Sequence, residues 1–135
     1  MNIKTLTAAL ATAALLAACG TTKTTAPAAG AKPSTLTQAA DGTLIGPDGR
    51  TLYVFAKDVA GSGKSTCVDA CAANWPPLGV AATAVPLGDY TIITRADGSK
   101  QWAFKGMPLY YYDKDTKSGD RLGDGVGGNW KITRP

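Results

Sequence analysis

The sequence LYVFAKD at residues 52–58 returns, little changed, as LYYYDKD at residues 109–115. Each copy carries aromatic residues at alternate positions, followed by a lysine and an aspartate. An Asn-Trp pair follows each copy at nearly the same spacing, at Asn74-Trp75 and Asn129-Trp130. Two landmarks that recur with almost the same offset indicate an internal duplication. The sequence therefore predicts two pseudo-repeats, at about residues 43–78 and 90–135.

The first copy predicts a strand with two apolar faces. Successive side chains of a strand point to opposite faces, so Tyr53 and Phe55 share one face. Leu52 and Val54 share the other face. Because both faces are apolar, we expect this strand to be central and covered on both sides.

The second copy is expected to repeat this arrangement. Tyr110 and Tyr112 share one face and should occupy the places that Tyr53 and Phe55 have in the first copy, mostly buried. Asp58 falls just past the first strand, where an aspartate commonly accepts backbone N–H bonds in a turn. We expect Asp58 to have a structural role rather than to bind a ligand.

Turn residues divide the rest of the chain into short apolar runs. The clearest turn is Asp97-Gly98, which predicts a hairpin, and Pro47-Asp48-Gly49 predicts another. The expected strands are residues 43–45, 51–56, 90–95, 100–104, 109–113 and 129–133. The predicted fold class is mainly β, a small antiparallel sandwich or barrel built from the two pseudo-repeats.

A short helix is predicted near Cys67–Asn74. Thr66 suits the N-cap position, alanines favour the helix, and Pro76-Pro77 ends it. Cys67 and Cys71 lie on one helical face, within reach of a disulfide. In an oxidising compartment a structural bridge between them is the default. A redox couple and a thiolate copper site are the alternatives, and no distal histidine is present to complete a copper site of the copper-chaperone kind.

The start of the chain has the pattern of an export signal. A basic start is followed by an apolar run that is too short to span a bilayer. The run ends in Leu16-Ala17-Ala18-Cys19, which resembles the lipobox of bacterial lipoproteins. The resemblance implies that residues 1–18 are removed and that Cys19 carries diacylglycerol and a further acyl chain, a near-permanent membrane anchor. Gly20 replaces the aspartate that marks inner-membrane retention, so an outer membrane is favoured where the cell has two.

Residues 19–40 have the composition of a flexible tether. They consist largely of Thr, Ala, Pro, Gly and Lys, and Leu36 is their one large apolar residue. Such a segment buries too little surface to offset its ordering entropy. We expect the folded domain to span residues 41–135.

Composition argues against several classes of function. The chain has no histidine, and every acidic residue is aspartate, which removes His-based acid–base catalysis and the usual zinc and haem ligands. The net charge is +4, but Lys4, Lys23 and Lys32 precede residue 41, so the domain itself is nearly neutral. The sequence shows no concentration of basic residues of the kind that would indicate a nucleic-acid partner. We expect no enzyme activity, no cofactor and no nucleic-acid binding.

Two loops resemble ligand sites without matching them. Gly61-Ser62-Gly63-Lys64-Ser65-Thr66 lacks the first glycine of a phosphate loop, where Asp58 stands. The aspartates of a second loop suggest calcium, but Lys117 stands where a fifth-position oxygen ligand belongs and no terminal glutamate follows. These aspartates are Asp113, Asp115, Asp120 and Asp124. We expect turn-rich loops and no metal.

The combined motifs resemble a known family. Both aromatic stretches fit the pattern Y-x-[FWY]-x-x-D. The Cys pair running into NWPPL at residues 74–78, the stretch QWAFKGMPLY at 101–110, and Trp130 match as well. The chain is similar to predicted bacterial lipoproteins with this motif, the secreted repeat of unknown function. The resemblance implies an envelope location and a duplicated domain. Lys131 departs from the histidine expected there in relatives.

These observations lead to two functional hypotheses. The first is a lipid-anchored, non-catalytic envelope module whose exposed tyrosines and tryptophans bind a polymer, a protein or a small ligand. The second is a redox or metal-handling protein that uses Cys67 and Cys71. The candidate structural or binding residues are Tyr53, Phe55, Asp58, Trp75, Trp102, Tyr110, Tyr112, Asp115 and Trp130.

Overall fold

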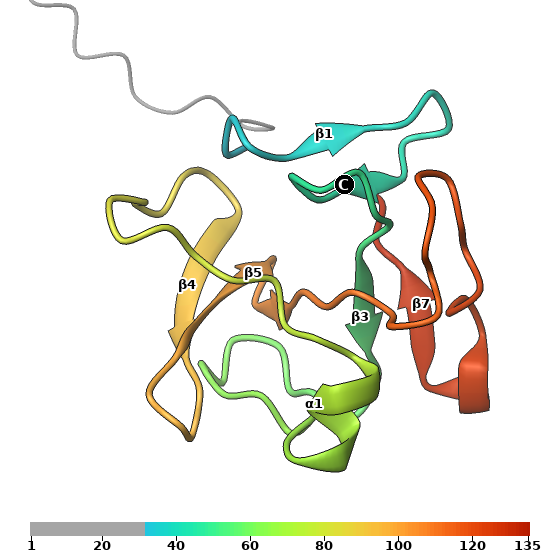
Figure 1. Cartoon of the computed structure of the whole chain (residues 1–135). Coiled ribbons are helices and arrows are strands. Elements are labelled where there is room, and N and C mark those ends of the chain that lie inside the picture. The colour runs from blue at the N-terminus through green and yellow to red at the C-terminus, as the bar shows by residue number, and fades with distance from the viewer. Residues whose placement is uncertain (1–31) are drawn as a thin grey trace, which may run out of the picture.

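The computed structural model describes residues 32–135, so the signal-like segment and Cys19 lie outside the described residues (Figure 1). Short strands dominate it, with one α-helix and one 3₁₀ turn. The elements are β1 (Thr37–Gln38), β2 (Leu44–Ile45), β3 (Tyr53–Phe55), α1 (Ala70–Asn74), β4 (Tyr90–Thr94), β5 (Lys100–Phe104), β6 (Met107–Pro108), η1 (Val126–Gly128) and β7 (Trp130–Ile132).

The strands form three small antiparallel sheets. β1 pairs with β2, β3 pairs with β7, and β4, β5 and β6 form the third sheet in that order. Figure 1 shows β4 and β5 on one side of the molecule, β3 and β7 on the other, and α1 below them. The mainly β prediction is confirmed, but within residues 32–135 the sheets do not close into a barrel.

The hairpin of the second repeat forms as predicted. β4 and β5 pair from Tyr90 opposite Phe104 to Thr94 opposite Lys100. Asp97 stabilises the turn between them, because its Oδ1 accepts hydrogen bonds from the backbone N and the hydroxyl of Ser99. Gly98 supplies the positive φ that the turn needs.

The folded domain begins before residue 41, so the predicted tether boundary is wrong. β1 lies within the expected tether and forms a ladder with β2. The expected pairing of residues 43–45 with 51–56 is reduced to one bridge, between Ile45 and Thr51. Leu36, the lone large apolar residue of the tether, is 1% exposed in the core. Burial of the Leu36 side chain stabilises the ordered form of this segment, and the overall composition of the segment does not predict that burial.

The second aromatic stretch is not a regular strand. No residue of 109–115 belongs to a strand, since β6 ends at Pro108, and Tyr110 makes single bridges to Tyr53 and Pro77. Backbone N–H groups further along donate instead to the segment after α1, with Tyr111 N bonding the Pro76 carbonyl. The stretch is extended, but its partners come from two different segments.

The predicted helix exists but is shorter and is capped differently. α1 spans Ala70–Asn74, and Asp69 occupies the N-cap position without a side-chain capping bond. Thr66 is therefore not the N-cap. Its backbone N and hydroxyl both donate to Asp58 Oδ1 instead. The last predicted strand is confirmed as β7.

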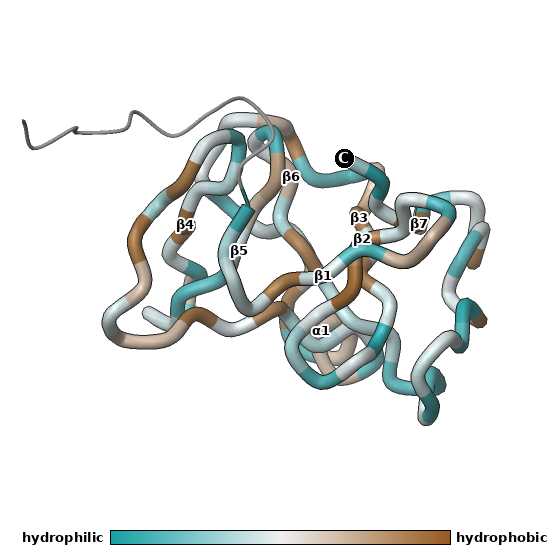
Figure 2. The backbone as a smooth tube through the Cα atoms, turned by 90° about the horizontal axis from the view of Figure 1, so that it is seen from above, coloured by the Kyte–Doolittle hydropathy of each residue, from teal (hydrophilic) through white to brown (hydrophobic). Residues whose placement is uncertain are grey.

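The core consists of two clusters with β3 between them. Tyr53 and Phe55 belong to an aromatic cluster. Leu52 and Val54 face a second, mixed cluster that contains Leu36 and Trp102. The predicted two-sided burial of this strand is confirmed. Along the chain, hydrophobic stretches alternate with hydrophilic turns, as expected for short strands (Figure 2).

All ten tryptophans, tyrosines and phenylalanines are buried. The expected binding surface of exposed tyrosines and tryptophans is therefore absent from the described domain, which contains all ten rings. Eight of the ten rings pack against another ring, a contact that contributes beyond simple burial, and the exceptions are Trp102 and Tyr111.

Candidate functional site

The two motif copies exchange their hydrogen bonds. The Tyr53 hydroxyl donates to Oδ2 of Asp115, at 2.6 Å. The Tyr110 hydroxyl donates to Oδ2 of Asp58, also at 2.6 Å. Each tyrosine therefore binds the aspartate of the other repeat, and all four side chains are buried. We call these four residues the tyrosine–aspartate lock.

The backbone of the lock has the same reciprocity. Tyr53 N donates to the Tyr110 carbonyl at 2.8 Å, and Tyr110 N donates to the Tyr53 carbonyl at 2.9 Å. The turn after each motif also closes in the same way, because Asp58 N bonds the Phe55 carbonyl and Asp115 N bonds that of Tyr112. The two motif copies are thus paired symmetrically about the Tyr53–Tyr110 contact.

The remaining carboxylate oxygens are also used. Oδ1 of Asp58 accepts two bonds from Thr66, each 2.7 Å, and Oδ1 of Asp115 accepts from Leu122 N at 2.9 Å. Gly123 N adds a bond to the Tyr53 hydroxyl. With both oxygens of each buried aspartate engaged, the arrangement supports the predicted structural role of Asp58.

Burial sets the protonation of the tyrosines. It is the main cause that raises the pKa of both Tyr53 and Tyr110 well above the ordinary value, and the hydrogen bond to the partner aspartate adds to it. Both hydroxyls therefore stay protonated at neutral pH and serve as donors.

Four rings form a stacked column beside the lock. Trp75 and Trp130 stack with their centroids 3.6 Å apart and their planes 4° from parallel. Phe55 stacks on the outer face of Trp130 at 4.3 Å, and Tyr112 stacks on that of Trp75 at 4.2 Å. The order Phe55, Trp130, Trp75, Tyr112 alternates between the repeats.

Trp102 lies apart from the other two tryptophans. It belongs to the mixed cluster and lines an open groove of about 410 Å³. Most of the groove lining is small and apolar, including Pro33, Pro47, Ala84 and Leu87. Of the predicted candidate residues, Trp102 is the one that reaches a groove of this size.

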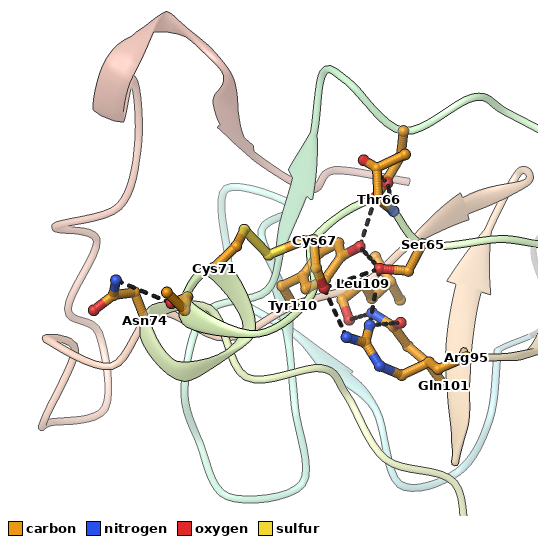
Figure 3. Close-up of a disulfide and its surroundings, with 11 residues drawn as sticks. Ser65, Thr66, Cys67, Cys71, Asn74, Arg95, Gln101, Leu109 and Tyr110 are labelled. Carbon is orange, nitrogen blue, oxygen red and sulfur yellow. Dashed lines mark hydrogen bonds between the residues drawn. A yellow bond between two sulfur atoms is a disulfide. The ribbon is translucent and has the colours of Figure 1, made fainter. Parts of the chain in front are cut away.

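Cys67 and Cys71 form the predicted disulfide, and a buried polar network lies beside it (Figure 3). The guanidinium group of Arg95 donates to the Cys67 carbonyl at 2.7 Å and to the Ser65 hydroxyl at 2.9 Å. Ser65 in turn lies 2.6 Å from the Tyr110 hydroxyl. The network thus joins the disulfide segment to the lock.

Sequence reasoning missed Arg95, Ser65 and Gln101. Arg95 directly follows β4 and precedes a polar turn, a place where an arginine is usually exposed. Instead it is buried, and the Gln101 side chain accepts from its guanidinium group at 2.7 Å. No signal in the neighbouring sequence distinguishes this arginine from a surface residue.

Three of the four aspartates of the second loop accept backbone hydrogen bonds through their side chains, namely Asp115, Asp120 and Asp124. Oδ2 of Asp120 accepts bonds from the backbone N of Thr116 and of Lys117, and Asp124 accepts from Ile132 N. Among residues 32–135, no three Cys or Asp side chains gather as metal ligands. Within the same residues, no helix combines the length and the apolar character that crossing a membrane would need.

A family model described as a secreted repeat of unknown function matches residues 35–79 and 91–133. The chain belongs to this family. The two matched segments confirm that the secreted-repeat domain is duplicated. The first segment begins close to β1, in agreement with the earlier start of the fold. No curated protein and no solved structure matches the chain.

Replacing Tyr53 by phenylalanine should lower the free energy of unfolding by about 1–3 kcal/mol, because Asp115 loses a buried hydrogen-bond donor. Tyr90→Phe is the matched control. The Tyr90 hydroxyl is buried with no partner in the described domain, so its removal should be neutral or slightly stabilising. Urea denaturation measures both. Equal losses in the two variants would contradict a specific role for the lock.

Proposed function

We propose that the mature protein is a lipid-anchored envelope module that binds or supports another envelope component, and that the lock and the ring column have no catalytic role in it. The observation that carries this proposal is the use of the shared motif residues. The tyrosines, aspartates and stacked rings that recur in both repeats are consumed in the buried lock and column. These shared residues stabilise the fold, and because their polar groups are buried they are not accessible to a substrate.

The anchor in this proposal is Cys19. Support comes from the lipobox-like sequence at residues 16–19 and from membership in a secreted family. The folded domain starts near Leu36, so the segment between Cys19 and the fold is shorter than composition alone suggested. The proposed location is the cell envelope, facing the periplasm from the outer membrane where a cell has two membranes.

The groove beside Trp102 is the surface we assign to a ligand. Its small apolar lining suits a small, mostly apolar molecule better than a charged one. Native mass spectrometry of the protein purified from its own envelope tests this assignment. A co-purifying molecule that is lost when Ala84 is replaced by tryptophan would support it, and a bare protein in repeated preparations would count against it.

Metabolic labelling with a radioactive fatty acid should mark the wild-type protein and not Cys19→Ser. The substitution removes the thiol that forms the thioether, so the variant should also leave the membrane fraction. The control is a Cys67→Ser, Cys71→Ser double variant, which keeps Cys19 and should keep its label. An unlabelled, soluble wild type would refute the anchor.

A further inference from the structure

Each repeat has a turn and a short helix after its aspartate, an α-helix in the first repeat and a 3₁₀ turn in the second, but only the first contains a disulfide. Thr66 N bonds Asp58 in the first repeat, and Leu122 N bonds Asp115 in the second. The chain then turns in the same way, with Cys71 N donating to the Val68 carbonyl and Val126 N to that of Gly123. Val126 therefore stands where Cys71 stands, and both turns deliver a buried tryptophan. The second repeat therefore positions its tryptophan without a disulfide.

The disulfide ring contains a strained residue. Asp69 lies between the cysteines with φ 53° and ψ −121°, a conformation that favours glycine. Its side chain makes no capping bond to α1 that would offset the strain. In the second repeat the positive φ angles of this region fall on Gly125, Gly127 and Gly128. The first repeat thus has backbone strain at Asp69, inside the disulfide ring. The second repeat avoids such strain because glycines occupy its positive-φ positions.

The two cysteines differ in how far solvent can reach them. Cys67 is 0% exposed and packs in the aromatic cluster, whereas Cys71 is partly exposed. No residue of the helix that carries Cys71 is fully buried, so this side of the ring can move at a lower cost than the side of Cys67. A groove of about 230 Å³, lined in part by Val68, Asp69 and Ala72, opens beside the ring.

Arg95 fixes the other side of the ring. Its guanidinium group holds the Cys67 carbonyl and is itself held by Ser65 and Gln101. Cys67 is therefore held in place when its bond to Cys71 breaks, whereas the partly exposed Cys71 can be approached from solvent. Cys67 is thus placed to be the leaving group, and Cys71 to be the sulfur that is attacked.

We propose that Cys67–Cys71 is a thiol–disulfide exchange site whose reaction partner is a protein dithiol of the envelope. The partner's thiolate attacks Cys71 Sγ, a mixed disulfide forms, and the Cys67–Cys71 bond breaks with its electron pair going to Cys67. The partner's second thiol then attacks its own sulfur in the mixed disulfide. Cys71 is released as a thiolate, and the partner leaves oxidised. Two electrons and two protons pass from the partner to this chain.

Redox titration of the full chain carrying Cys19→Ser tests the proposal with dithiothreitol as the probe dithiol. Alkylation and mass counting give the reduced fraction, and circular dichroism follows the fold. We expect reduction without unfolding. Asp69→Gly should relieve strain in the oxidised form and favour the disulfide about tenfold, which moves the midpoint by about 30 mV to more negative potential.

The matched control is Lys105→Gly. Lys105 also has a positive φ, of 48°, but lies in the turn between β5 and β6, away from the cysteines. This variant should leave the midpoint unchanged. Reduction that unfolds the wild type, or a midpoint that Asp69→Gly does not move, would mean that the bridge is structural and would overturn the proposal.

The direction of attack is tested with single cysteines. In the Cys19→Ser background, Cys67→Ser leaves only Cys71, and Cys71→Ser leaves only Cys67. Cys71 should react with glutathione disulfide about tenfold faster than Cys67, because it is the more accessible sulfur. Equal rates, or a faster Cys67, would overturn the assigned roles. None of these outcomes depends on lipid attachment, so they are independent of the proposed anchor.

Discussion

Replacing Trp130 by alanine should lower the free energy of unfolding by about 3–5 kcal/mol, the range for large aromatic residues in a well-packed core. Trp130 occupies an inner position of the ring column, between Trp75 and Phe55. Tyr110 also meets it edge-on, with ring centroids 5.2 Å apart. Removal of the indole therefore breaks two stacked contacts and one perpendicular contact and leaves a cavity between the repeats. Phe55→Ala, at the end of the column, should fall in the same range of about 3–5 kcal/mol.

Urea denaturation followed by circular dichroism measures these losses. Leu122→Ala is a suitable control, because this side chain is 60% exposed and its loss should change stability by no more than about 0.5 kcal/mol. A loss below about 1 kcal/mol for Trp130→Ala would show that the column does not hold the repeats together. The same result for Phe55→Ala would indicate an exposed ring and a binding surface.

Separation of the two repeats should abolish the fold of each. The ring column alternates between repeats, and both hydroxyl–carboxylate bonds of the lock cross from one to the other. A lone repeat would expose its half of the column and leave buried polar groups unpaired, at a cost that a domain of this size cannot absorb. The disulfide cannot compensate. It lies within one repeat and closes a short ring, which contributes roughly 2 kcal/mol in the chain-entropy model.

The experiment expresses residues 32–82 and 83–135 as separate chains. Near-ultraviolet circular dichroism should show no fixed tertiary structure in either half, and mixing should restore the native spectrum with a one-to-one complex. As a control, the intact chain carrying a protease site in the loop between residues 81 and 86 should stay folded after cleavage. A half that folds alone, or halves that do not combine, would contradict the interlocked arrangement.

Local signals account for the parts of the fold that were predicted correctly. The β4–β5 hairpin follows from Asp97-Gly98 at its tip, because turn chemistry is set by adjacent residues. The two apolar faces of the motif predicted burial between two layers, and β3 lies between two clusters. The disulfide could be predicted from the sequence because Cys67 and Cys71 are close along the chain.

The parts of the fold that the sequence did not predict depend on contacts between residues far apart in the chain. The composition of residues 19–40 predicts a tether. In the structure Leu36 is buried in the core, and β1 pairs with β2. The burial of Arg95 depends on Ser65 and Gln101, which the fold brings to it from other segments. Thr66 was expected to cap the helix and instead binds Asp58.

The sequence by itself determined the duplication, the strand character of the motif and the local turns, because these depend on the periodicity and turn chemistry of neighbouring residues. Only the tertiary structure decided that Tyr53 binds Asp115 and that Tyr110 binds Asp58. Each repeat supplies the same donor and the same acceptor, so the sequence allows pairing within a repeat as readily as between repeats. Pairing between repeats prevails because Tyr53 and Tyr110 lie side by side, and each hydroxyl then meets the aspartate that ends the other motif.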